Sequence, residues 1–166
     1  MPKTRSKNNK KAAAPPNHDR VISVNRRAFF NYEIMERYEA GLVLTGTEIK
    51  SLRAGRVDLS DAYVRPQDGE LWLLNSHIAT YGPASIYNHE PKRPRKVLLH
   101  RWEIVELSDA VHQKGLTIVP LRLYIKNHVA KVELGLARGK RQYDKRRAII
   151  DRDMDRDARQ AMRAGR

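Results

Sequence analysis

The chain has 166 residues, contains no cysteine and carries a formal net charge of +14 at pH 7. The absence of cysteine excludes disulfides, thiolate catalysis and cysteine-based zinc sites. No apolar run approaches the ~18 residues of a membrane-spanning helix, and the excess of basic residues predicts a polyanionic partner.

The positive charge is concentrated at the two ends of the chain. Residues 1–20 hold six basic residues and one acidic residue, and residues 138–166 hold eleven basic and five acidic residues. Residues 21–137 are nearly balanced, with sixteen basic and thirteen acidic residues. We therefore expect a disordered basic N-terminal tail (1–20), a folded domain (21–139) and a basic C-terminal tail (140–166).

A cytoplasmic location is expected because the alanine run at residues 12–14 stops at two prolines and is too short for a signal-peptide core. A basic protein bound to a membrane surface is the alternative. The basic ends lack the bulky apolar faces with Trp or Phe on which such binding depends.

In chain order, residues 25–38 predict a strand, on which Tyr32, Ile34 and Glu36 alternate, and the apolar run 42–44 between glycines predicts a second, buried strand. Thr45 and Glu48 then have the spacing of a capping box, which predicts a short helix that ends at Gly55. On this helix Ile49 and Leu52 should face inward, and the outward face should carry Lys50, Ser51 and Arg53.

Two further strands are predicted at residues 62–65 and 71–78, joined by a turn at 66–69. On the second strand, Trp72 should point to the face opposite Leu71 and Leu73. Residues 80–96 contain three prolines and the basic cluster 92–96, and they predict a long loop with a functional role. Residues 100–114 predict a helix with Ile104, Leu107 and Val111 on one face. His100 is a candidate cap, and Gly115 is the stop.

Residues 116–124 and 129–136 alternate between apolar and polar around a turn at 126–128, which predicts a hairpin. Short antiparallel strands with two small helices indicate a mainly β, α+β chain that forms a closed barrel rather than a sandwich.

The tail beyond residue 144 has too few apolar residues to pack a helix onto a core. Its arginines are nevertheless spaced by four, three and four, so that a helix would place them in one stripe: Arg152, Arg156, Arg159 and Arg163. Ile150, Met154 and Ala161 would lie on the opposite side. This pattern predicts a segment that is disordered when free and helical along a polyanion; the alternative is a solvated tail without a function.

The six histidines show no metal-binding spacing, and the chain contains no recognisable nuclease, hydrolase or P-loop motif. We expect no metal, no cofactor and no enzymatic activity.

Four separated blocks, at residues 38–55, 93–100, 121–127 and 139–146, resemble in this order the small protein B family, the SsrA-binding proteins that partner transfer-messenger RNA. The resemblance covers nearly everything from Asn25 to the C-terminus. It implies an oligonucleotide-binding-type β-barrel with flanking helices and a basic C-terminal tail, which agrees with the strand pattern.

The resemblance implies that Tyr32 and Glu39 belong to the surface that receives the tRNA-like domain of transfer-messenger RNA. A tyrosine offers a stacking face and a hydroxyl, while a carboxylate repels phosphate and helps only if it meets a base edge. Leu98 and His100 resemble the loop-contacting residues of the family. Phosphate contacts, which position an RNA without reading its sequence, are expected from Lys50, Arg53, Lys126, Lys131 and Lys140.

In the tail, the resemblance implies that Tyr143, Asp144, Lys145 and Arg146 contact the decoding centre and the empty messenger channel of the small ribosomal subunit. Tyr143 stands where relatives often carry His, a change compatible with base stacking but not with proton transfer. The stripe from Arg152 to Arg163 is expected to bind the ribosome as well.

The implied function is an RNA-binding adaptor that delivers alanyl-charged transfer-messenger RNA to ribosomes stalled without a stop codon. Elongation factor Tu and the ribosome are the further partners, and a monomer without membrane contact is expected. A basic structural protein of the ribosome is the alternative, and an RNA-processing enzyme is a third possibility.

Overall fold

The structure is a computed structural model that describes residues 20–165. The disordered tail expected at residues 1–20 lies outside the described residues except for Arg20, which begins strand β1 (Arg20–Val24).

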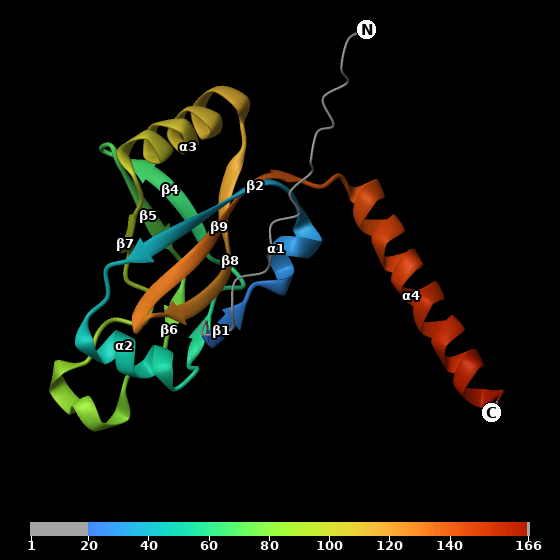
Figure 1. The fold of residues 1–166 in the computed structure, drawn as a ribbon, viewed down its shortest axis with the longest axis horizontal. Helices are drawn as coiled ribbons and strands as arrows, with labels where there is room; N and C mark the ends of the chain where they lie inside the picture. Colours follow the sequence, from blue (N-terminus) through green and yellow to red (C-terminus); the bar gives the residue numbers. More distant parts are fainter. Residues whose placement is uncertain (1–19, 166) are drawn as a thin grey trace, which may run out of the picture.

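Six antiparallel strands close into a ring (Figure 1). In spatial order they are β8 (Thr117–Lys126), β4 (Tyr63–Gln67), β5 (Glu70–Leu74), β7 (Arg95–Leu98), β2 (Tyr32–Leu42) and β9 (Val129–Gly139), which pairs again with β8. Strand β4 bridges β8 only at Val64 and Ile118, and β1 pairs with β8 further along. The predicted mainly β, α+β class and the oligonucleotide-binding-type barrel are confirmed.

The barrel interior is filled by alternate residues of each strand, because successive side chains of a strand point to opposite faces. Leu71 and Leu73 of β5 are buried and Trp72 between them is half-buried, as predicted. The predicted hairpin is also confirmed: β8 and β9 meet at Asn127 and His128, which both have positive φ. Two-residue hairpin turns of this kind match the right-handed twist of the flanking strands.

Helices α2 (Gly46–Arg53) and α3 (Arg101–Lys114) lie at opposite ends of the barrel (Figure 1). The capping box of α2 is confirmed, since the Thr45 N–H donates to Glu48 Oε2 at 2.8 Å. His100 caps α3 as predicted, and its N–H donates to Glu103 Oε2 at 2.9 Å. Gly115 ends α3 in the left-handed region at φ 61°, where a side chain would be strained.

The strand predicted over residues 25–38 is wrong in its first half, because Arg26–Asn31 forms helix α1. Asn25 caps this helix by accepting from the Ala28 N–H at 3.0 Å. Its amide also donates to the carbonyls of Leu59 and Pro120, so that the entry to the helix is held by distant parts of the chain. Strand β2 begins only at Tyr32.

Two further strand predictions are wrong in their extent. The buried strand expected at 42–44 is the end of β2, which stops at Leu42, and Val43 is exposed. The strand expected over 71–78 breaks at Asn75, which has φ 56°. After the break, β6 (His77–Ile78) pairs with β3 (Val57–Asp58) in a separate small sheet. Ser51, expected on the outside of α2, is fully buried.

The loop predicted at residues 80–96 contains a 3₁₀ helix, η1 (Gly82–Tyr87), and its end already belongs to β7. Its basic cluster turns partly inward: Arg95 Nε lies 2.8 Å from Glu48 Oε1, and Arg93 Nη2 lies 2.5 Å from Glu48 Oε2. Glu48 and Arg95 are both fully buried. Lys96 pairs with Glu70. Much of the charge in this cluster therefore holds the fold together.

Candidate nucleic-acid interface

One outer face of the barrel gathers residues from four neighbouring strands. Cross-strand pairing runs from Tyr124 in β8 to Lys131 in β9, then to Gly41 in β2 and Leu98 in β7. Residues that pair across antiparallel strands point to the same side of a sheet. This surface, named the outer sheet face, is formed by Tyr124, Lys126, Lys131, Glu39 and Leu98. It brings together four of the side chains predicted to bind RNA.

Glu39 is engaged within the outer sheet face. The Tyr124 hydroxyl donates to Glu39 Oε2 at 2.6 Å, and Lys126 Nζ lies 3.1 Å from the same oxygen. The hydrogen bond from Tyr124 is the main cause that lowers the pKa of Glu39; burial opposes it, and Lys126 and Lys131 add to it. The carboxylate is therefore ionised at neutral pH and holds both partners in place, while its side chain stays 42 % exposed.

Leu98 extends this face to the edge where β7 leaves the sheet. It lies over Gly41, where an added Cβ would stand 3.4 Å from Leu98 Cβ, an ordinary van der Waals contact. The Leu98 side chain remains 49 % exposed. His100 follows two residues later and leads into α3, where Trp102 is exposed. The sequence reasoning missed Trp102, although it lies outside the apolar face of Ile104, Leu107 and Val111.

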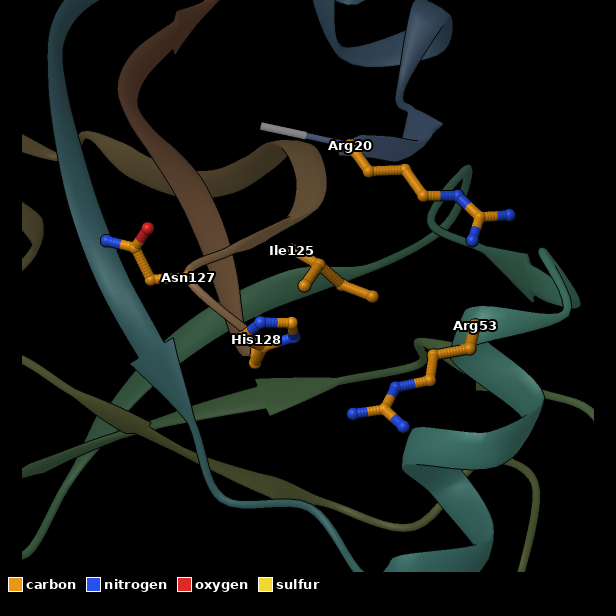
Figure 2. Close-up of a pocket in the computed structure, with 5 residues that line it drawn as sticks. All are labelled: Arg20, Arg53, Ile125, Asn127 and His128. Carbon is orange, nitrogen blue, oxygen red and sulfur yellow. The ribbon is translucent and has the colours of Figure 1, made fainter. Parts of the chain in front are cut away.

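A cleft of about 420 Å³ lies beside the β8–β9 turn, and it is lined by Arg20, Arg53, Ile125, Asn127 and His128. Figure 2 shows Arg20 reaching in from β1 and Arg53 from α2, with Ile125 and His128 between them. None of these lining residues is acidic. Two guanidinium groups in a concave site favour a phosphate group, which arginine binds through paired hydrogen bonds. Among these residues only Arg53 was predicted to contact RNA. The sequence could not show the others, because the cleft forms where three segments distant in the sequence come together.

The other predicted residues of the domain lie elsewhere. Lys50 lies on α2 with its Nζ 5.4 Å from the centre of the Tyr81 ring. Tyr32 begins β2, where it packs with Ala28 and Val119 beside α1. Glu39 lies seven positions after Tyr32 along β2, which at ~3.3 Å per residue is about 23 Å. A single nucleotide therefore cannot touch both.

Lys140 lies at the same end of the barrel as Tyr32. Its Nζ donates to the Phe29 carbonyl at 3.1 Å and its backbone N–H donates to the Asn31 carbonyl at 2.9 Å. These bonds satisfy carbonyls at the end of α1, so that Lys140 joins the barrel to this helix.

The C-terminal tail forms helix α4 (Gln142–Ala164), which extends away from the barrel in Figure 1 and has no buried residue. The predicted arginine stripe is present on one side, where Arg152, Arg156, Arg159 and Arg163 line a groove of about 360 Å³ with Asp155 and Gln160. Tyr143, Asp144, Lys145 and Arg146 form its first turn, in which Asp144 complements the positive end of the helix dipole. Whether the free tail is disordered stays a prediction.

Across residues 20–165, no three His, Asp or Glu side chains converge as ligands for a metal ion. No helix within this part of the chain is long and apolar enough to cross a membrane.

The chain is similar to a family and to proteins that are already known. The model of the family described as SmpB protein matches residues 22–164. An SsrA-binding protein of Carboxydothermus hydrogenoformans is 52% identical over 146 residues, which are 88% of this chain and 98% of that protein. An SsrA-binding protein of Dehalococcoides mccartyi is 56% identical over 137 residues, 82% of this chain and 80% of the relative.

A solved structure, "tmRNA-SmpB: a journey to the center of the bacterial ribosome", contains a similar chain with 52% sequence identity and a TM-score of 0.63. The match covers 78% of this chain and 94% of the other. The barrel, its order of strands and these similarities agree, and the chain belongs to the SmpB family of SsrA-binding proteins.

Proposed function

We propose that this protein is an RNA-binding adaptor that binds the tRNA-like domain of transfer-messenger RNA and delivers it to stalled ribosomes. The observation that carries the proposal is the 52% identity to nearly the whole of a chain from a tmRNA-SmpB ribosome structure. The outer sheet face and the arginine helix α4 supply two separate surfaces for the two RNA partners of such an adaptor.

The barrel would receive the tRNA-like domain on the outer sheet face and the neighbouring cleft. Arg20, Arg53, Lys50 and Lys131 would contact phosphates, which position an RNA without reading its sequence. Leu98 and His100 would contact bases at the edge of the face. Glu39 would act chiefly by orienting Tyr124 and Lys126, to which it is already bonded. The exposed edge of its carboxylate would accept a hydrogen bond from a base.

The tail would bind the small ribosomal subunit. Its 23 helical residues span about 35 Å at ~1.5 Å per residue, long enough to follow a groove of RNA. Tyr143, Asp144, Lys145 and Arg146 would reach the decoding centre, and the arginine stripe would lie along the empty messenger channel. We propose that the tail is disordered when free, and that its helix is stabilised by this contact.

Three further features belong to the proposal. Elongation factor Tu would accompany the charged RNA, the protein would act as a monomer in the cytoplasm, and it would carry out no catalysis. The division into tails at 1–20 and 140–166 around a domain at 21–139 follows the charge distribution, and the two border residues, Arg20 in β1 and Lys140 bonded to α1, join the tails to the domain.

The salt dependence of binding tests the proposed function. Affinity for the transcribed tRNA-like domain should fall by ~0.9 log units per log unit of salt for each phosphate neutralised on a duplex. Lys131→Ala should lower this slope by about one if Lys131 contacts a phosphate. Lys114→Ala, beyond the opposite end of β8, is the matched control and should leave the slope unchanged. An affinity that does not change between low and moderate salt would contradict the proposed function.

Reversing the charge of Glu39 tests the role of the outer sheet face. Glu39→Arg removes the acceptor of Tyr124 and places a like charge beside Lys126, so RNA binding should weaken by about 1–3 kcal/mol, the range of a specific base contact. A gel-shift titration measures the affinity, and a circular dichroism spectrum checks the fold.

Glu33→Arg makes the same charge change at an exposed position of β2 and serves as the control. Because both variants add positive charge, a purely electrostatic interface would bind RNA more tightly in both. Equal affinities of Glu39→Arg and the wild-type chain, with a normal spectrum, would remove Glu39 from the interface.

A further inference from the structure

Trp102 is a large aromatic side chain on the surface of the first turn of α3, and it is 65 % exposed. The apolar side of this helix, with Leu107 buried and Ile104 and Val111 against the core, points elsewhere. The indole therefore adds little to the stability of the barrel. An exposed indole beside other exposed apolar groups is typical of a binding surface.

Two exposed residues, His100 and Leu98, precede Trp102 by two and four positions. The rings of His100 and Trp102 are parallel to within 7°, with their centroids 6.5 Å apart. Leu98 is exposed two residues before His100 and belongs to the outer sheet face. Leu98, His100 and Trp102 thus follow each other at every second residue from the edge of that face onto α3. A planar group that stacks on one of the two rings is automatically parallel to the other.

We propose that Trp102, together with His100, is a stacking platform for an unpaired base of the bound RNA. The inference deepens the proposed function and rests on it. Base–aromatic stacking tolerates any base because every base has a π face. Loops and ends of RNA supply such bases, since they are not held in a helix.

An RNA base fits this platform better than a protein segment because the platform continues a surface that carries cations. Lys131 lies in the same cross-strand row as Leu98, and Arg101 is exposed beside Trp102. The carboxylates next to Trp102 along α3 are those of Glu103, which already accepts from the His100 N–H, and Glu106, four residues further on. The uncharged face of a base can therefore stack on the platform. The phosphates of the same RNA contact the cations of the outer sheet face.

Tryptophan fluorescence tests the proposal directly, because the chain has only two tryptophans. Trp72→Phe leaves Trp102 as the single reporter. Titration with the transcribed tRNA-like domain should quench its emission, with the same midpoint as a gel shift. In the otherwise wild-type chain, Trp102→Ala should weaken binding by about fivefold or more, the lower end for one base–aromatic stack. The salt slope should not change, because no cation is lost.

Two conservative variants separate stacking from packing. Trp102→Tyr keeps an aromatic face and should retain most of the affinity, whereas Trp102→Leu is apolar without such a face and should bind like Trp102→Ala. One outcome is that the wild-type chain binds RNA, Trp102→Ala binds it equally well and the Trp102 emission is not quenched. This outcome overturns the stacking platform and leaves the proposed function standing. If the wild-type chain itself fails to bind the RNA, the proposed function fails. Normal RNA binding by Trp102→Ala with weaker binding to ribosomes or elongation factor overturns the platform in favour of a protein contact.

Discussion

A chain that ends after Lys140 should fold and bind transfer-messenger RNA, and it should fail to support peptide tagging on stalled ribosomes. The last strand, β9, ends at Gly139, and Lys140 hydrogen-bonds to α1. Beyond it, α4 meets α1 through Arg152, whose guanidinium lies 5.9 Å from the centre of the Phe30 ring. Helix α4 has no buried residue, so its removal should change the free energy of unfolding by only about 0.5 kcal/mol, as for other surface changes. RNA binding should weaken modestly through the lost positive charge.

The assay is tagging of a nascent chain on a truncated message, run beside RNA binding with the same proteins. Asp144→Ala combined with Lys145→Ala and Arg146→Ala should lower tagging in the full-length chain. Met154→Pro should also lower it, because proline breaks the helix at the start of the arginine stripe. Met154→Ala removes the same exposed side chain without breaking the helix and should tag normally. Full tagging by the truncated chain would exclude the decoding-centre role and leave the tail as a solvated appendage.

Removing one member of the buried pair Glu48–Arg95 should have the largest effect on stability. Both side chains are fully buried, with Arg95 Nε 2.8 Å from Glu48 Oε1. Arg95 also donates to the carbonyl and hydroxyl of Ser76, both at 2.8 Å. Glu48→Gln leaves the buried charge of Arg95 without its partner, which typically costs about 3–5 kcal/mol. Arg95→Leu should cost less, because Glu48 keeps its ion pair with Arg93. Denaturant unfolding should show this as a lower midpoint with an unchanged slope.

The pair Lys96–Glu70 is a matched control on the same strand, because its side chains are 37% and 40% exposed. Lys96→Ala should cost less than about 1 kcal/mol, as is usual for surface ion pairs. In the buried pair, Glu48→Gln combined with Arg95→Leu should cost less than the sum of the single changes, because neither charge is then left alone. Additive costs would show that the two side chains stabilise the fold independently.

The same pair predicts a loss of stability in acid. Burial opposes ionisation of Glu48, but hydrogen bonds from Arg93 and the Thr45 N–H and the charge of Arg95 outweigh it, so that its pKa is lowered from the ordinary 4.5. A carboxylate with a lowered pKa contributes its full stability above the unfolded value and loses it as the pH falls through the folded value. Wild-type stability should therefore drop below about pH 4.5, more steeply than that of Glu48→Gln.

Local patterns in the sequence determined several elements correctly. The alternation around residues 126–128 predicts the β8–β9 hairpin, the Thr45–Glu48 spacing predicts the start of α2, and Gly115 predicts the end of α3. Each signal lies within a few contiguous residues and acts through the backbone of the same segment. The arginine stripe of α4 was predicted for the same reason, since it depends only on helical spacing.

The candidate interface was only partly predictable. The resemblance to a known family singled out Glu39, Leu98 and His100, and the outer sheet face brings Glu39 and Leu98 together with Lys126 and Lys131. The hydrogen bond between Tyr124 and Glu39 joins residues 85 positions apart, and the cleft joins Arg20 and Arg53 with the distant turn at His128. No short stretch of the sequence contains all the residues of either contact.

The sequence by itself determined the class of the fold, the main hairpin, the helix caps and the polyanionic character of the partner. Tertiary structure fixed where the helix at residues 26–31 begins, since the Asn25 amide that caps it also bonds to carbonyls 34 and 95 residues away. It also decided that Arg95 is buried against Glu48, 47 residues earlier, although its sequence neighbours predict a basic loop with a functional role. The physical reason is that the strand ring closes. Closure determines which side chains distant in the sequence come into contact, and a charged side chain is buried only where a partner of opposite charge is buried beside it.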